Sequence, residues 1–161
     1  MPRIGITGHS ALAGDTAVLV ADGLREVLAE WAGDSLVGVT CLARGADQIF
    51  ARVVLELGGS VEVVLPAADY RERKVKPGNA AEFDELLDQV AAVHTMPFAV
   101  SGRAAYLAAS EHVMAEVERM VAVWDGAPAD GAGGTGDVVL AARQRGLAVT
   151  VVWPAGAARG R

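Results

Sequence analysis

The fold assignment starts from residues 36–47, Leu36-Val37-Gly38-Val39-Thr40-Cys41-Leu42-Ala43-Arg44-Gly45-Ala46-Asp47. The apolar run over 36–41 predicts a short buried strand, and the glycine-containing turn behind it leads into a helix. The apolar residues of that helix recur on one face, and the helix ends at a glycine pair; these residues are Ile49, Val53, Val54, Leu57 and Gly58-Gly59. Strand, short turn and amphipathic helix form the repeating unit of a parallel sheet.

The same alternation continues in both directions. The other predicted strands are Ile4–Thr7, Val61–Leu65, Val93–Phe98, Met120–Trp124 and Ala148–Trp153, with Pro97 making 93–98 unsuitable as a central strand. Helices are predicted between them, starting near Asp15, around Phe83, over Ala104–Arg119 and over Asp137–Arg145. We therefore predict an α/β, Rossmann-like, doubly wound, mostly parallel sheet of five to six strands with helices on both faces. Residues 1–154 are expected to form a single domain, and 155–161 a disordered tail.

Composition limits the function classes. Of the 161 residues, 52% are hydrophobic and 21% charged, with a mean hydropathy of +0.32. A sheet covered on both faces would absorb this apolar excess, and a homo-oligomer interface would absorb it as well. No apolar run approaches the roughly 20 residues of a membrane span. The single cysteine, Cys41, and the lack of a signal peptide favour a cytoplasmic location. A net charge of −6 and 5% aromatic residues make nucleic acid an unlikely partner.

Three glycine-containing loops are predicted to meet at one edge of the sheet, because ligands of open parallel sheets bind at the carboxyl ends of the strands. In the loop before the helix at 137–145, Gly133, Gly134 and Gly136 would let backbone N–H groups approach an anion. Thr135 adds a hydroxyl, and the helix N-terminus adds a favourable dipole. The alternative is a surface loop in which Asp137 caps the helix.

The other two loops offer weaker signals. After the first strand, Gly8, His9 and Ser10 either contact the ligand or form a turn and a helix cap. Arg44, beside Gly45, is of a type that binds phosphate through two hydrogen bonds; the alternatives are a solvated surface arginine or a partner for Asp47.

Trp124 ends a strand just before Asp125-Gly126, where its ring could flank a base. The basic run of Arg71, Arg73, Lys74 and Lys76 is either a lid over the anion or a solvated segment. In the first loop, Gly5-x-x-Gly8 does not fit the Gly-x-Gly-x-x-Gly fingerprint, and no Walker sequence occurs in the chain, which disfavours dinucleotide oxidoreductases and P-loop NTPases. His94 and His112 lack the spacing of metal ligands, so we expect no metal and no cofactor.

With these loops in view, the sequence resembles the SLOG superfamily, which includes the Lonely Guy cytokinin-activating enzymes and the DNA-processing protein A family. The resemblance spans about residues 3–154. It is carried by four motifs, namely Gly5-Ile6-Thr7-Gly8-His9, Leu42-Ala43-Arg44-Gly45-Ala46-Asp47, Val121-Ala122-Val123-Trp124-Asp125-Gly126 and Gly133-Gly134-Thr135-Gly136-Asp137. It implies that the chain binds a nucleotide or nucleotide derivative, as a sensor or ligand-binding module.

In the Lonely Guy branch, the resemblance implies hydrolysis of the N-glycosidic bond of a nucleoside 5′-monophosphate, and therefore an alternative function as a phosphoribohydrolase-like N-glycosidase. That branch has the pattern Pro-Gly-Gly-x-Gly-Thr-x-x-Glu, in which Gly134-Thr135 matches and the Glu position holds Val138. Asp137 lies one position earlier and is the candidate acidic catalytic residue. If Met114 matches that branch's helical methionine, its arginine position holds Ser110.

Overall fold

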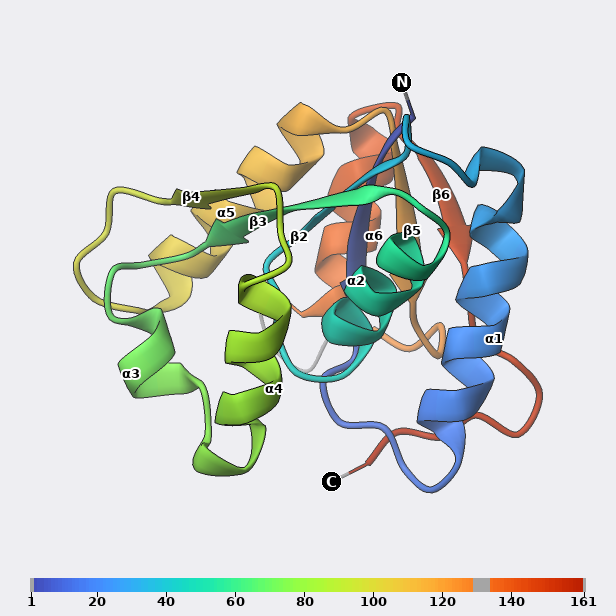
Figure 1. Ribbon diagram of the computed structural model, residues 1–161, viewed down its shortest axis with the longest axis horizontal. Coiled ribbons are helices and arrows are strands. Elements are labelled where there is room, and N and C mark those ends of the chain that lie inside the picture. The colour runs from blue at the N-terminus through green and yellow to red at the C-terminus, as the bar shows by residue number, and fades with distance from the viewer. Residues whose placement is uncertain (1, 129–133, 161) are drawn as a thin grey trace.

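The strands and helices alternate along the chain as predicted. The computed structural model describes residues 2–128 and 134–160, and its sheet has six strands (Figure 1). They are β1 (Arg3–Gly8), β2 (Val37–Thr40), β3 (Ser60–Leu65), β4 (Ala92–Thr95), β5 (Arg119–Val123) and β6 (Ala148–Val151). Their order is β4-β3-β2-β1-β5-β6, and every neighbouring pair is parallel. The Rossmann-like α/β prediction is therefore confirmed.

Helices cover both faces of this sheet. The helices are α1 (Thr16–Leu28), extended by the 3₁₀ turn η1 (Ala29–Trp31), α2 (Ala46–Glu56), α3 (Tyr70–Lys74), α4 (Pro77–Leu87), α5 (Arg103–Glu116) and α6 (Thr135–Gln144). Helices α1, α2 and α4 lie on the face toward the viewer in Figure 1, and α5 and α6 lie behind the sheet. This two-sided arrangement is the doubly wound form that parallel strands require for burial.

Two hydrophobic clusters form the core, one on each face. On the first face Leu24 of α1, Phe50 of α2 and Phe83 of α4 are completely buried against strand residues such as Ile4. On the second face Val113 and Met114 of α5 pack with Val37, Val39 and Met120. Successive strand residues therefore point to opposite faces, and β2 buries all of its residues, as expected near the centre of such a sheet.

The sheet ends in β4 on one side and β6 on the other. All residues of β4 are exposed, and Pro97 follows it, in agreement with the prediction that 93–98 would not be central. In the described ranges 2–128 and 134–160, no helix has the length and apolar content to cross a membrane.

Some element boundaries differ from the sequence predictions. Helix α5 ends at Glu116 because Val117 has extended backbone angles (φ −125°, ψ 159°), so the predicted end at Arg119 is wrong. The helix α3 was not predicted, because its five residues contain one apolar side chain and therefore no helical periodicity. That side chain, Tyr70, is buried and fixes the short helix on the core.

Residues 155–160 do not form the disordered tail that the sequence predicts. Ala158 accepts a hydrogen bond from Ala13 N–H and donates its own N–H to Thr16 Oγ1, both at 2.9 Å. Leu12 and Arg159 form an antiparallel bridge. The 155–160 segment makes these contacts with its own backbone atoms, so its sequence of Ala, Gly and Arg gives no side-chain pattern from which they could be predicted.

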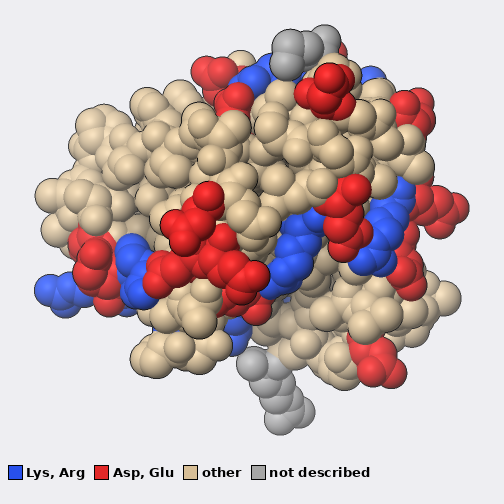
Figure 2. Space-filling view, viewed as in Figure 1, with Lys and Arg blue, Asp and Glu red and all other residues tan. Residues whose placement is uncertain are grey.

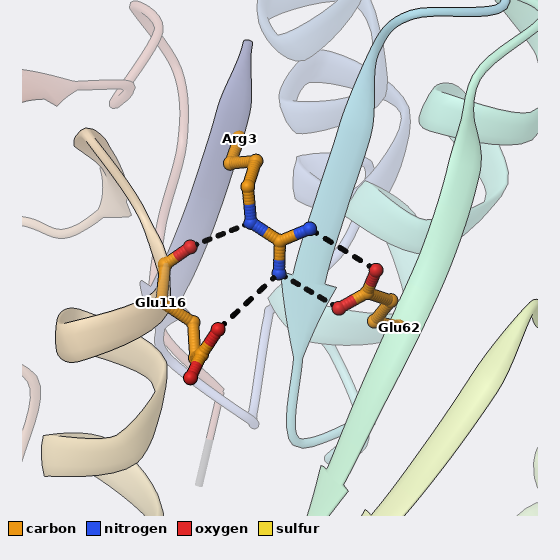
Figure 3. Close-up of polar contacts among 3 residues, drawn as sticks. All are labelled: Arg3, Glu62 and Glu116. Carbon is orange, nitrogen blue, oxygen red and sulfur yellow. Dashed lines mark hydrogen bonds and ion pairs between the residues drawn. The ribbon is translucent and has the colours of Figure 1, made fainter. Parts of the chain in front are cut away.

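At the amino edge of the sheet, Arg3 connects β1 with two other elements (Figure 3). Its NH1 and NH2 groups donate to the carboxylate of Glu62 on β3 at 3.1 and 2.7 Å. Its Nε donates to the carbonyl of Glu116 at 2.7 Å. This network lies at the opposite edge from the carboxyl ends of the strands and therefore serves the fold.

Candidate functional site

The strand order reverses between β1 and β5. The connection from β1 leads through α1 to β2 on one side, whereas β5 leads through α6 to β6 on the other. Gly8 is in register with Val123 at the ends of these strands. Because the loops behind the two strands diverge, a crevice opens between them, which is where ligands bind in open α/β sheets.

A cavity of about 660 Å³ occupies this edge. Its walls come from the loop behind β1, the loop behind β2, the α3–α4 region, α5, the loop behind β5, the start of α6 and the 155–160 segment. The polar and aromatic lining residues are Thr7, His9, Ser10, Arg44, Asp47, Tyr70, Lys74, Lys76, Asn79, Tyr106, Ser110, Thr135 and Arg159. The volume lies within the range of small-molecule sites.

The loop behind β1 is fixed through His9, which is buried. Its backbone N–H donates to the carbonyl of Val123 at 3.1 Å, and its Nε2 accepts the N–H of Asp125 at 3.2 Å. Burial lowers the pKa of His9, with the nearby Arg159 acting in the same direction, while Asp125 opposes both. His9 therefore joins the loops of the two strands at the switch point as a hydrogen-bond acceptor, in addition to lining the cavity.

The loop behind β2 has two residues with positive φ. Leu42 has φ 59° and donates its N–H to Thr40 Oγ1 at 3.0 Å, and Gly45 has φ +85°. A Cβ at Gly45 would contact the backbone carbonyl of Ser10. At Leu42, which has a Cβ, such a conformation costs energy and is retained where surrounding structure enforces it, often at functional sites, whereas glycine adopts it readily. The conformations of Leu42 and Gly45 bring the loop behind β2 into contact with the loop behind β1, and they place Arg44 at the cavity.

Asp47, in the first turn of α2, is the only acidic residue among the described residues that line the cavity. Its Oδ2 accepts the N–H of Ala43 at 3.2 Å, and the side chain is 8% exposed. Burial raises the pKa of Asp47 to about 7, against the opposing hydrogen bonds from Ala43 and Thr40. The carboxyl group can therefore exist in either protonation state near neutral pH.

The basic run predicted as a lid divides into two parts. Lys74 and Lys76 line the cavity. Arg71 instead holds Asp84 of α4 through two hydrogen bonds of 2.8 Å, and Arg73 is not a lining residue. Position in the sequence could not separate these residues, because the separation depends on the short helix α3.

The start of α6 forms another wall. Gly134, Thr135 and Gly136 all line the cavity, and Thr135 is the first residue of the helix. The N-terminus of a helix carries unpaired N–H groups and a partial positive charge, so this wall favours an anion. Gly133 lies outside the described residues.

The cavity brings together Gly8, His9, Ser10 and Arg44 with Gly134, Thr135 and Gly136. The remaining predicted site residues do not line it. They are Gly45, which packs under Ser10; Trp124, which donates to the carbonyl of Ala127; Asp125, whose N–H donates to Nε2 of His9; and Gly126 and Asp137, which are exposed. Sequence reasoning missed Tyr70, Asn79, Tyr106 and Arg159.

Four cationic side chains line the cavity, against the single described carboxyl group of Asp47; they are Arg44, Lys74, Lys76 and Arg159. The rest of the surface does not share this excess. On the face seen in Figure 2, Lys and Arg lie among Asp and Glu and do not form one basic surface. Within residues 2–128 and 134–160, no group of three or more His, Cys, Asp or Glu side chains is arranged to hold a metal ion.

No family model and no curated protein sequence matches the chain. Solved structures do match. DNA processing protein A from Helicobacter pylori, whose single-stranded DNA binding mode has been described, aligns with a TM-score of 0.67 and 18% identity over 99% of this chain and 69% of that one. DNA processing protein A from Streptococcus pneumoniae aligns with a TM-score of 0.66 and 17% identity over 94% of this chain.

The chain spans 50% of the length of the Streptococcus protein. The Moco carrier protein of Chlamydomonas rheinhardtii also aligns, with a TM-score of 0.55 and 17% identity over 93% of this chain and 74% of that one. These likenesses confirm the predicted resemblance at the level of the fold, because the chain shares its Rossmann-like fold with DNA processing protein A, whose family the sequence resembles.

Proposed function

We propose that this SLOG-type chain binds a nucleotide or nucleotide derivative in the 660 Å³ cavity, as a sensor or ligand-binding module. One observation supports this most directly. Arg44, Lys74, Lys76 and Arg159 converge with the N-terminus of α6 on one cavity in a chain whose net charge is −6. Such local positive potential in an acidic protein attracts a small anion.

The cavity also offers a surface for a planar group. Tyr106 lines it and meets Tyr70 edge-on, with ring centroids 6.5 Å apart. Asn79 lines the same region, and its side-chain amide, which exchanges one pair of hydrogen bonds with Gln48, keeps a second N–H and a second oxygen lone pair for a base. Phosphate-binding groups together with an aromatic and amide wall suit a nucleotide better than a simple inorganic anion.

A small ligand is favoured over single-stranded DNA. Binding a strand without sequence preference needs a basic groove that follows the backbone and aromatic side chains on which successive bases stack. The chain has 5% aromatic residues, and the surface in Figure 2 mixes charges of both signs. We therefore place the ligand inside the cavity and not along the surface.

A thermal-shift panel with nucleoside mono-, di- and triphosphates, NAD, ADP-ribose and cyclic nucleotides tests the proposal. A ligand at 100 times its Kd stabilises the native state by about 2.7 kcal/mol, which raises Tm measurably.

Gly134→Val should abolish the shift, because a side chain would block the backbone at the start of α6. Gly102→Val is the matched control, since Gly102 begins α5 in the same way, has open space around it and does not line the cavity. No shift with any member of the panel would contradict the proposal.

N-glycosidase activity on a nucleoside 5′-monophosphate is the second candidate, favoured by the carboxyl group inside the cavity. A general acid works best when its pKa is close to the working pH, and that of Asp47 is about 7. Chromatography of the same samples would detect released base. If Asp47 is the general acid, Asp47→Asn should stop the release of base while the nucleotide still binds. If the acid is Asp137, as the sequence suggested, Asp137→Asn should stop it instead.

A further inference from the structure

The 155–160 segment folds back along the loop behind β1. Leu12 and Arg159 form an antiparallel bridge, and Gly160 N–H donates to the carbonyl of Ala11 at 2.9 Å. Ala158 N–H donates to the hydroxyl of Thr16, a residue that is 1% exposed. The backbone is therefore fixed on both sides of Arg159, at Ala158 and at Gly160, and the position of Arg159 follows from it.

This path brings the side chain of Arg159 to the cavity. The guanidinium NH1 lies 3.8 Å from Oδ2 of Asp125, and the other carboxylate oxygen of Asp125 lies 3.3 Å from Nε2 of His9. Asp125 Oδ1 also accepts the N–H of Ala127 at 3.0 Å. Asp125 is thus held by the loops at the switch point, and it in turn orients Arg159 beside the cavity.

Arg159 differs from the other lining cations in its position along the sheet. Lys74 and Lys76 follow β3 in the chain and Arg44 follows β2, so these three approach from one side of β1. Arg159 is paired with the loop behind β1 and with Asp125, behind β5. Among the described lining residues, it is the one Lys or Arg on the switch-point side, next to the wall that α6 begins.

From this placement we infer that Arg159 is an anion-binding residue of the cavity, and that the 155–160 segment is one of its functional walls. The inference rests on the proposed function, since it assigns a phosphate-binding group of the same site. A guanidinium has five N–H donors in a planar fork, so it can bind a phosphate bidentately while remaining beside a carboxylate. An anion at the start of α6 would thus be held from both sides, by Arg159 and by the cations that follow β2 and β3.

The first test measures the affinity of the wild type and of Arg159 variants by calorimetry, with 5′-AMP and ADP-ribose as probes and adenosine as the uncharged control. Arg159→Ala should weaken binding of the charged probes about 10- to 100-fold, the effect of losing a hydrogen bond to a charged group. Arg159→Lys should weaken it less, because it keeps the charge and loses the bidentate geometry. Arg143→Ala, an exposed change of equal charge on α6, should leave the affinity unchanged.

The second measurement does not depend on a variant. Trypsin cleaves after arginine, and intact-mass spectrometry follows loss of the residues beyond Arg159. ADP-ribose should slow this cleavage at least several-fold in the wild type, because the bound anion would hold the arginine side chain. Equal affinities of the wild type and Arg159→Ala would overturn the inference and leave the proposed function standing. Failure of the wild type to bind either charged probe, together with no shift for any nucleotide of the thermal panel, would overturn both.

Discussion

Gln48 and Asn79 exchange two side-chain hydrogen bonds, each of 2.9 Å, between α2 and the first turn of α4. Gln48 is 1% exposed, and its Nε2 also donates to the carbonyl of Leu42 at 3.1 Å. The buried amide of Gln48 therefore supplies a hydrogen bond to the carbonyl of Leu42, in the strained loop behind β2. The same amide positions Asn79, which lines the cavity. The site thus depends on a contact between residues 31 positions apart.

Gln48→Leu should lower the free energy of unfolding by about 1–3 kcal/mol, because the change leaves the carbonyl of Leu42 and the amide of Asn79 without their partner. Urea denaturation provides the measurement. Gln89→Leu is the control, since Gln89 is exposed and makes one local hydrogen bond to the carbonyl of Glu85. Equal losses in the two variants would contradict the role assigned to Gln48.

Gly45→Ala should destabilise the protein more than Gly14→Ala. Both glycines have positive φ, +85° and +55°, so both substitutions carry a backbone cost of about 1 kcal/mol or more. The Cβ at Gly45 would also contact the carbonyls of Ser10 and His9, whereas nothing lies within 4 Å at Gly14. The difference between the two unfolding free energies reports this lack of space together with the backbone angles of Gly45 (φ 85°, ψ −126°), which a residue with a Cβ adopts rarely. A difference near zero would show that the loops move apart without cost.

Asp47 should make the protein less stable as the pH rises from about 4 to about 7. Burial raises the pKa of Asp47 to about 7 from an ordinary value of 3.8, so the folded state holds a proton that the unfolded state has lost. Stability should fall across this interval by up to about 1.4 kcal/mol per pH unit, and the full loss should be present above it.

Asp47→Asn keeps an oxygen for the N–H of Ala43 and cannot ionise. Urea unfolding of this variant should therefore lack the decline seen in the wild type, and the two curves should diverge as the pH approaches 7. Parallel curves for the two proteins would show that the carboxylate is solvated in the folded state.

The alternation of apolar runs and amphipathic helices was sufficient to predict the sheet, because strands buried on both faces are apolar throughout. Pro97 correctly marked an edge. The convergence of three loops also follows from topology, since Gly8 ends β1, Arg44 lies in the loop between β2 and α2, and Gly134 comes directly before α6.

The missed site residues depend on tertiary contacts that leave no local pattern. Tyr70 belongs to a helix too short to show periodicity. Asn79 acquires its position from a buried partner on α2. Arg159 reaches the cavity through backbone hydrogen bonds of a small-residue segment, which depend on no particular side-chain sequence. Asp125 stood in a recognised motif, yet the structure turns its carboxylate to His9.

Arg3→Met should reduce stability without affecting the cavity. The Arg3–Glu62 pair is bidentate but partly exposed, with side chains 29% and 34% accessible, so solvent screening limits the expected loss to about 1 kcal/mol. The hydrogen bond from Arg3 lowers the pKa of Glu62, so this stabilisation is present above the ordinary pKa of 4.5 and is lost as the pH falls below it. Urea unfolding at pH 7 and at pH 3 should show a larger wild-type advantage at the higher pH, the part that remains at pH 3 coming from the hydrogen bond of Arg3 to the carbonyl of Glu116. An altered affinity for 5′-AMP would contradict the assignment of this network to the fold.

His9→Gln should remove a loss of stability that the wild type shows on mild acidification. Burial lowers the pKa of His9 below its ordinary value of 6.5, so the unfolded chain takes up a proton at a higher pH than the folded protein does. Stability should therefore be complete above pH 6.5 and decrease as the pH falls below it. Glutamine keeps an acceptor for the N–H of Asp125 but has no charge to gain.

His94 and His112 are present in both proteins, so their contributions cancel in the difference between the two unfolding free energies. That difference, measured between pH 7.5 and 5, should shift in favour of the variant as the pH falls. A constant difference over this range would mean that His9 is protonated as readily in the folded protein as in the unfolded chain, and its role as an acceptor between the two loops would then be wrong.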